Sequence, residues 1–274
     1  MSQDLPIGTH EGLPEADYHV RELGVASKSA LDLVHRSPAH YKAWVDGTIE
    51  EEDRLAFKRG TALHCAVLEP EKYARVYTAH PDFGDCRKKE NKAARNEWRE
   101  ANKARIWLPV DMLESVNGMS RAVLAHPLAS KLFVGGKSEV TLRWQDETTG
   151  LQCKARVDYL SGNGATAIDL KSTANADYDA FKRSVSTYGY HRQAAFYSEG
   201  LRSLEKPVSY FLFVAVESAA PYGVATYSLN AEALAKGLSS IRDDLETLAT
   251  CVKTNEWPGY PVRLQELDLP PWAA

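Results

Sequence analysis

Several features that would place this 274-residue chain outside or across a membrane are missing from it. It has only four cysteines, and no two of them form a C-x-x-C pair, so neither a zinc ribbon nor an iron–sulfur cluster is expected. No apolar run approaches the ~18 residues that a membrane helix needs. Residues 1–13 lack the basic start and the apolar stretch of a signal peptide, so we predict a cytoplasmic protein without a membrane partner.

An excess of positive charge is also missing. The chain has 33 Lys and Arg against 37 Asp and Glu, for a net charge of −4. Any contact with a nucleic acid must therefore come from a local basic patch or from bound metal cations. Hydrophobic residues make up 44% and charged residues 26%, which is typical of a folded globular protein. No internal repeat or linker divides the sequence, and we predict one domain over residues 1–274.

The periodicity of the apolar residues changes along the chain. Residues 1–135 predict mainly helices, among them 52–69 and 109–125. From residue 137 the pattern alternates, with Val140, Leu142 and Trp144 on one face of a strand, and it predicts three antiparallel strands up to Lys171. A helix over 188–204, strands over 208–216 and 222–229, and a helix over 231–254 follow. This order predicts an α/β fold with a sheet core over 136–230 and a C-terminal helix and tail over 231–274.

One short segment carries a concentrated positive charge. Residues 87–105 contain eight Lys or Arg against three Glu. On a helix, five of the basic residues share one face, because they recur at intervals of three and four: Lys88, Lys92, Arg95, Arg99 and Lys103. The segment is interpreted below in two ways.

Two acids and a lysine near the ends of adjacent predicted strands suggest a catalytic site. Asp158 lies on the second strand, and Asp169 and Lys171 share one face of the third. Facing carboxylates repel one another, and a hard cation such as Mg²⁺ relieves that repulsion. Metal-bound water beside a lysine suits phosphodiester hydrolysis. The alternative is that the D-x-K triplet arises by chance and carries solvated charges.

Further residues in the same order support the catalytic interpretation. Gly60 and His64 share a helix face, where glycine permits the close approach of another element and imidazole can bind a metal. Glu139 lies on the polar face of the first strand, and Gln193 and Tyr197 point the same way from the following helix, as phosphate-positioning groups do. Taken singly, each has a structural interpretation as well: a structural histidine, a solvated carboxylate and a packing pair.

This order of motifs resembles the PD-(D/E)XK nuclease superfamily, in its RecB-like branch and especially its phage and prophage exonuclease VIII (RecE-type) group. The motifs are G-x-x-x-H, Glu, Asp, D-x-K and Q-x-x-x-Y. Four other segments look like the same group: Ser27–Leu31, Ser37–Tyr41, Arg59–His64 and the closing Leu269–Trp272. The sequence departs from the family at Val157, which stands where the superfamily name has a proline.

The resemblance implies a restriction-endonuclease-like αβββαβ core with a mixed sheet and helical N-terminal additions. It also implies a metal held by His64, Asp158, Asp169 and the carbonyl of Leu170, with Lys171 as the catalytic lysine. Glu139 would complete the site, and Gln193 and Tyr197 would orient the bound DNA. The ion would be Mg²⁺, which Mn²⁺ can replace, and the lone Cys251 could not supply the iron–sulfur cluster that some relatives carry.

The implied activity is an exodeoxyribonuclease that degrades one strand of linear duplex DNA from 5′ to 3′ in phage-type recombination. Relatives are often ring-like homo-oligomers that serve a single-strand annealing protein. In this light the basic residues Lys88, Lys92, Arg95 and Arg99 would neutralise backbone phosphates, and Trp98 and Trp107 would stack on unpaired bases. A solvated helix with internal Glu–Lys pairs is the alternative for this segment. An endonuclease of the same fold, a catalytically silent DNA-binding module and a domain with scattered surface charges are the alternatives for the whole chain.

Overall fold

A seven-stranded mixed sheet forms the centre of the computed structural model, which describes residues 5–49 and 55–269. The sheet order is β1-β5-β6-β7-β8-β9, and a short strand β2 pairs with β6 beside this path. The strands are β1 (Gly8–His10), β2 (Val25–Ala26), β5 (Lys137–Gln145), β6 (Gln152–Leu160), β7 (Thr166–Thr173), β8 (Tyr210–Glu217) and β9 (Val224–Ser228).

The predicted three-stranded meander is present. β5, β6 and β7 pair antiparallel in chain order, and β7 then pairs in parallel with β8 over its whole length. A parallel pair needs a crossover, and the helices α9 (Tyr178–Thr187) and α10 (Tyr190–Ser203) provide it. This arrangement confirms the expected α/β fold with an αβββαβ core and a mixed sheet.

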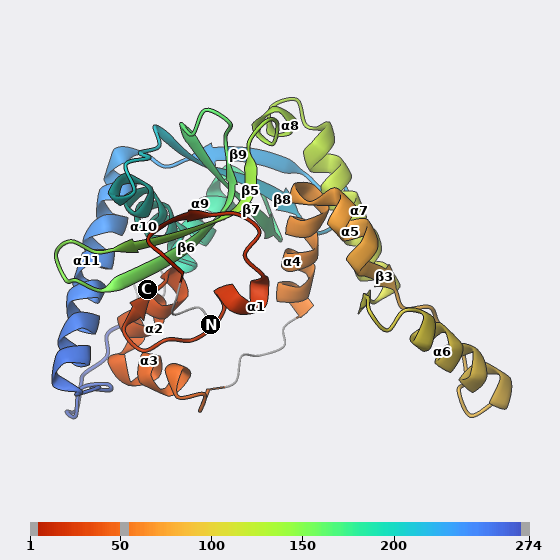
Figure 1. Cartoon of the computed structure of the whole chain (residues 1–274), viewed down its shortest axis with the longest axis horizontal. Helices are drawn as coiled ribbons and strands as arrows, with labels where there is room; N and C mark the ends of the chain where they lie inside the picture. Colours follow the sequence, from red (N-terminus) through yellow and green to blue (C-terminus); the bar gives the residue numbers. More distant parts are fainter. Residues whose placement is uncertain (1–4, 50–54, 270–274) are drawn as a thin grey trace.

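Helices cover both faces of the sheet, and each face has its own apolar core (Figure 1). On one face, α2 (Lys28–Arg36), α3 (Pro38–Val45), α10 and α11 (Ala231–Thr254) contact one another. Their core includes Leu31, Trp144, Phe196 and Phe213. On the other face, α4 (Leu55–Leu68) and α7 (Val110–Ala125) pack over Ile168, Leu170 and Val214. Alternation along β7 explains this division, because Ala167 belongs to the first core and Ile168 to the second.

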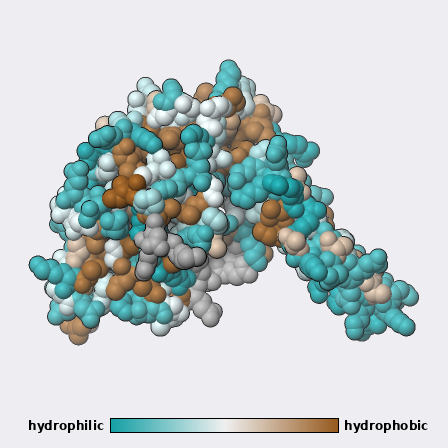
Figure 2. All heavy atoms as spheres, viewed as in Figure 1, coloured by the Kyte–Doolittle hydropathy of each residue, from teal (hydrophilic) through white to brown (hydrophobic). Residues whose placement is uncertain are grey.

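Part of the chain between α4 and α7 forms an arm that projects from the body (Figure 1). It contains β3 (Tyr77–Ala79), α6 (Lys89–Ala101) and β4 (Ile106–Leu108), and β3 and β4 pair in parallel at its base. Three short helices complete the described fold: α1 (Glu15–Tyr18), α5 (Pro70–Val76) and α8 (Ala129–Leu132). The arm is mainly hydrophilic in Figure 2. Among the described helices, none has the length and apolarity to cross a bilayer.

The structure contains elements that the sequence patterns did not reveal. The predicted helical part, 1–135, contributes β1 and β2 to the central sheet, and these strands of three and two residues are too short for a periodicity to reveal. Helix α9 was not predicted, although Asp177 caps its N-terminus by accepting a hydrogen bond from the Ala180 N–H. The predicted helix over 52–69 begins at residues that lie outside the described part. Residues 270–272 of the closing segment also lie outside it.

Candidate active site

The site lies at the point where the paired strands β6 and β7 separate, which we call the fork. Only two residue pairs join these strands, Tyr159 with Ile168 and Leu160 with Ala167. The next pair in this register is Asp158 with Asp169, and no ladder bond joins them. Instead, the Leu170 N–H donates to Asp158 Oδ2 over 2.8 Å. The side chain of Asp158 thus replaces a backbone acceptor and holds the fork open, so that both acids lie at its edge.

Helix α4 brings His64 to this fork. His64 Nε2 lies 2.8 Å from the carbonyl oxygen of Leu170, and Nδ1 lies 3.5 Å from Asp158 Oδ2. A carbonyl oxygen can only accept, so Nε2 carries a proton and donates. Nδ1 then faces a carboxylate, and this contact is favourable only if Nδ1 is also protonated or if a cation lies between the two atoms. A histidine placed in this way is a candidate metal ligand.

Glu139 completes a group of three potential ligands. It lies across from Asp158 in the β5–β6 register. The pairs on either side, Ser138 with Tyr159 and Val140 with Val157, belong to the ladder of paired residues, whereas Glu139 and Asp158 do not. Its φ of 53° is in the left-handed region, which is unfavourable for a non-glycine residue and is often found at functional sites. One potential ligand atom from each of His64, Glu139 and Asp158 lies within 4.8 Å of the others.

The electrostatics of Glu139 fit a cation site. Burial, together with the nearby Asp158 carboxylate, raises the pKa of Glu139 to about 7, although His64 and Arg156 oppose the shift. In the absence of metal, Glu139 therefore loses its proton only around neutral pH. A divalent cation would remove this penalty, because it neutralises the two facing carboxylates.

Asp169 and Lys171 form an ion pair beside this group. Lys171 Nζ lies 2.7 Å from Asp169 Oδ2, and Gln193 connects the pair by donating to Asp169 Oδ1 over 2.5 Å and accepting from Lys171 over 3.0 Å. The ammonium also lies 4.7 Å from the ring centre of Tyr190. Both Asp169 and Gln193 are buried, so the pair is held in one geometry by the surrounding fold.

The charges of this pair follow from its burial. Desolvation raises the pKa of Asp169 to about 6, and the neighbouring ammonium limits the rise. Burial by itself would lower the pKa of Lys171, but Asp169 and Asp158 together outweigh that effect and raise it. Lys171 is therefore an ammonium group at neutral pH. Its role in a reaction is to place positive charge and to donate hydrogen bonds.

The donor set fits a hard divalent cation. One imidazole and two carboxylates converge from three elements. The geometry differs from the predicted ligand set in two respects. Glu139, expected to support the site, lies within the closest group, whereas Asp169 lies outside it and pairs with Lys171. The Leu170 carbonyl accepts a hydrogen bond from His64.

The structure places the predicted DNA-contacting residues in two different settings. Gln193 and Tyr197 are both buried, and both polar ends of the Gln193 amide are used within the site. Burial raises the pKa of Tyr197 well above its usual value. Lys92 and Arg99 are exposed on α6, Arg95 is half-buried there, and Lys88 precedes the first residue of the helix. The basic residues thus lie on the projecting arm, whereas Gln193 and Tyr197 belong to the interior.

Trp98 and Trp107 pack against other rings of the arm. Their ring centres are 5.2 Å apart, and His80 lies within 6.0 Å of both. Phe83 joins the same cluster, and the Arg99 guanidinium lies over the Trp107 ring at 5.6 Å. These rings form the small core of the arm. The expectation that they stack on unpaired bases is therefore not supported by their contacts.

Two residues of the site were not found from the sequence. Arg156 lies one β-strand period before Asp158, donates to Thr141 and to the Leu13 carbonyl, and lies 4.3 Å from the ring centre of Tyr18. Its charge acts on Glu139. The alternation of β6 could have identified Arg156, whereas nothing in the sequence near Tyr18 indicates that the N-terminal segment reaches this face.

Gly60 also differs from the expectation. A Cβ added at this position would meet no atom of the described residues within 4 Å. The predicted close approach of another element of the chain is therefore absent from the described part, and the space beside Gly60 is open.

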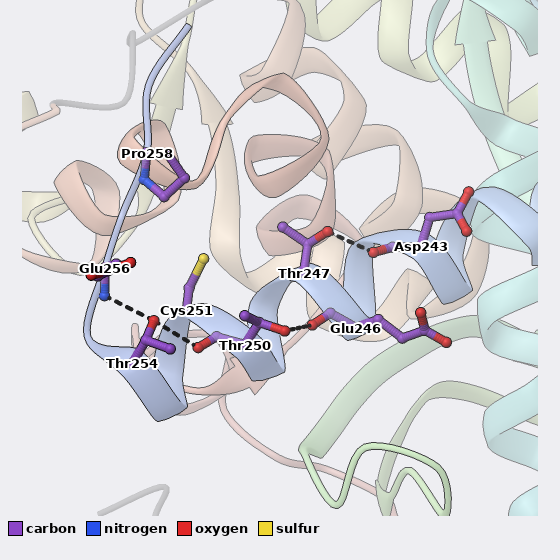
Figure 3. A pocket seen from close by; sticks show the side chains of 8 residues that line it. All are labelled: Asp243, Glu246, Thr247, Thr250, Cys251, Thr254, Glu256 and Pro258. Carbon is purple, nitrogen blue, oxygen red and sulfur yellow. Dashed lines mark hydrogen bonds between the residues drawn. The ribbon is translucent and has the colours of Figure 1, made fainter. Parts of the chain in front are cut away.

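A groove of about 550 Å³ lies elsewhere, along α11 and the segment after it. Asp243, Thr247 and Cys251 line it together with Glu256 and Pro258 (Figure 3). None of the residues that line this groove belongs to the fork between β6 and β7. It is not part of the candidate site.

The chain matches the model of a known protein family and resembles known structures. The model of a family described as "PDDEXK-like domain of unknown function (DUF3799)" matches residues 27–266. The crystal structure of a protein described as a "putative exonuclease" from Eubacterium rectale is similar with a TM-score of 0.63 and 15% identity, over 95% of this chain and 97% of that one. A structure of SSO0001 aligns with 69% of this chain and 84% of its own, at 14% identity and a TM-score of 0.31, which is too low to support an argument. No curated protein sequence matches the chain.

Proposed function

Because this chain belongs to that PDDEXK-like family, and so to the PD-(D/E)XK nuclease superfamily, we propose that it is a divalent-metal-dependent nuclease acting at DNA ends. The observation that carries the proposal is the convergence of His64, Glu139 and Asp158 within 4.8 Å, beside the buried Asp169–Lys171 pair. Isolated surface charges would have no reason to converge from α4, β5, β6 and β7 in this way.

The residues divide the chemistry between them. His64, Glu139 and Asp158 would hold the ion, which supplies a polarised phosphate and a water of lowered pKa. Lys171 donates from an ammonium group that Asp169 and Gln193 fix in place, and it stabilises the negative charge that develops at phosphorus. Gln193 is a positioning residue, because it contacts the pair and is buried.

Oxygen-rich coordination favours Mg²⁺, and the histidine makes Mn²⁺ an effective substitute. We further propose degradation of one strand of linear duplex DNA from 5′ to 3′, in recombination of the phage type, in the cytoplasm. The same proposal includes a ring-like homo-oligomer and a single-strand annealing protein as partner. The arm would contact backbone phosphates through Lys88, Lys92, Arg95 and Arg99, since these side chains are grouped on and beside α6.

The test is digestion of a linear duplex that carries distinguishable labels at its 5′ and 3′ ends, with Mg²⁺ or with EDTA. We expect loss of the 5′ label first, only with the metal, and no cutting of a covalently closed circle. Cutting of the circle would favour an endonuclease of the same fold. Metal binding without loss of either label would favour a catalytically silent module and would contradict the proposal.

A further inference from the structure

One face of α4 is partly exposed, carries an aromatic side chain and leads to the metal ligands. Four residues of α4 lie on one side of the helix, because the last three follow the first at intervals of three, four and seven residues: Phe57, Gly60, Thr61 and His64. The Phe57 residue is 67% exposed, and Thr61 is exposed as well. The buried side of α4 is formed by other residues, among them Leu63 and Ala66. This face, which we call the α4 track, is not used by the core.

Gly60 lies within the 14-residue helix, where glycine is less favourable than alanine. Neither packing nor backbone strain explains it, because an added Cβ would meet no described atom within 4 Å, and its φ is not in the left-handed region. A glycine that faces open space one turn from His64 leaves room there for a group from outside the described residues.

An exposed phenylalanine is the second unusual feature of the track. No aromatic contact within the described residues covers the Phe57 ring, in contrast to the arm, where Trp98 and Trp107 pack against each other. Exposed aromatic rings are platforms on which unpaired nucleic-acid bases stack.

We propose that the α4 track is the surface along which a DNA strand with unpaired bases reaches the metal centre. Phe57 stacks on a base of that strand, and Gly60 leaves room for its backbone. Seven helical residues separate Phe57 from His64 and span about 10 Å, or about three nucleotide steps of B-form DNA. The preferred substrate is therefore a frayed or single-stranded end rather than a blunt one. This inference rests on the nuclease function proposed above.

Binding measurements test the track without depending on cleavage. The probe is a duplex with a short single-stranded end that carries 2-aminopurine, whose fluorescence is quenched by stacking, in Ca²⁺ to prevent turnover. Phe57→Ala should weaken binding about tenfold, within the range for loss of one stacked base, and should abolish the protein-dependent quenching. Phe57→Trp should restore both. The matched control is Leu55→Ala, which removes an equally exposed apolar side chain, 62% exposed, from outside the track.

Gly60→Leu tests the clearance. Leucine favours the helix, so the melting temperature should not fall, whereas binding of the same probe should weaken tenfold or more. Wild-type binding by Gly60→Leu would overturn the role of Gly60. Equal losses in Phe57→Ala and Leu55→Ala, or unchanged quenching in Phe57→Ala, would overturn the role of Phe57. If the wild-type protein binds the probe but never cleaves DNA in Mg²⁺, the nuclease proposal fails while the track is still tested by binding.

Discussion

Replacing Glu139 with glutamine should stabilise the metal-free protein at alkaline pH. The pKa of Glu139 is raised from about 4.5 to about 7 by burial and by Asp158. Between these two values the folded state binds more protons than the unfolded state, so the free energy of unfolding decreases as the pH rises through this window. The full shift corresponds to about 3 kcal/mol at pH 8, at 1.36 kcal/mol for each pKa unit.

Glutamine keeps the shape of the side chain and removes the charge. Without metal, Glu139→Gln should therefore exceed the wild type in stability by up to about 3 kcal/mol at pH 8, and by little at pH 4.5. In a chain of this size that difference raises the melting temperature by roughly 5–10 °C. Addition of Mg²⁺ should reverse the order, because ligand binding stabilises the wild type and the variant has lost one ligand.

The assay is thermal unfolding in EDTA and in Mg²⁺ at several pH values between 4.5 and 8. Glu114→Gln is the matched control, since Glu114 is exposed on α7 and away from the fork. Two results would refute the reasoning. One is a Glu139→Gln variant that is less stable than the wild type at pH 8 in EDTA, and the other is a stability difference that does not change with pH.

Three further predictions concern activity and binding. Asp169→Ala should lose nearly all DNA cleavage with the far-UV circular dichroism spectrum unchanged, and a rate near the wild type would remove this carboxylate from the mechanism. Lys171→Ala should lower kcat by a factor of about 100 to 1,000, as expected for loss of a group that stabilises the transition state, while a calorimetric Mn²⁺ titration still shows binding. Lys92→Glu together with Arg99→Glu should weaken DNA binding and reduce the slope of log Kd against log salt by about 2, and an unchanged slope would show that the arm does not contact phosphates.

Much of the sheet was predictable because its strands follow simple patterns. Alternation in β5 and β6 identified the apolar face that packs against α10, and the D-x-K spacing placed Asp169 and Lys171 on the same side of β7. α11 has the bounds that were predicted, and in the structure Asn230 caps its start. Local signals of this kind do not depend on distant contacts.

The arrangement of the site depended on contacts that a pattern does not contain. Glu139 joins His64 and Asp158 with its backbone in a left-handed conformation, and alternation does not indicate that conformation. Gln193 has the expected position on α10, but its burial and its contacts to Asp169 and Lys171 result from the packing of α10 against the sheet. The stripe of basic residues predicted α6 correctly but not the arm that carries it.

The most direct test of the metal centre compares the wild type with Asp158→Asn in the degradation of an end-labelled linear duplex as Mg²⁺ is titrated. Asparagine keeps the size of the side chain and removes one charged ligand from the group. We predict that the wild type degrades the duplex only when a divalent cation is present and that Asp158→Asn is inactive, or needs far more Mg²⁺, while remaining folded. Degradation by the wild type in EDTA, or wild-type rates and metal dependence in Asp158→Asn, would contradict the account.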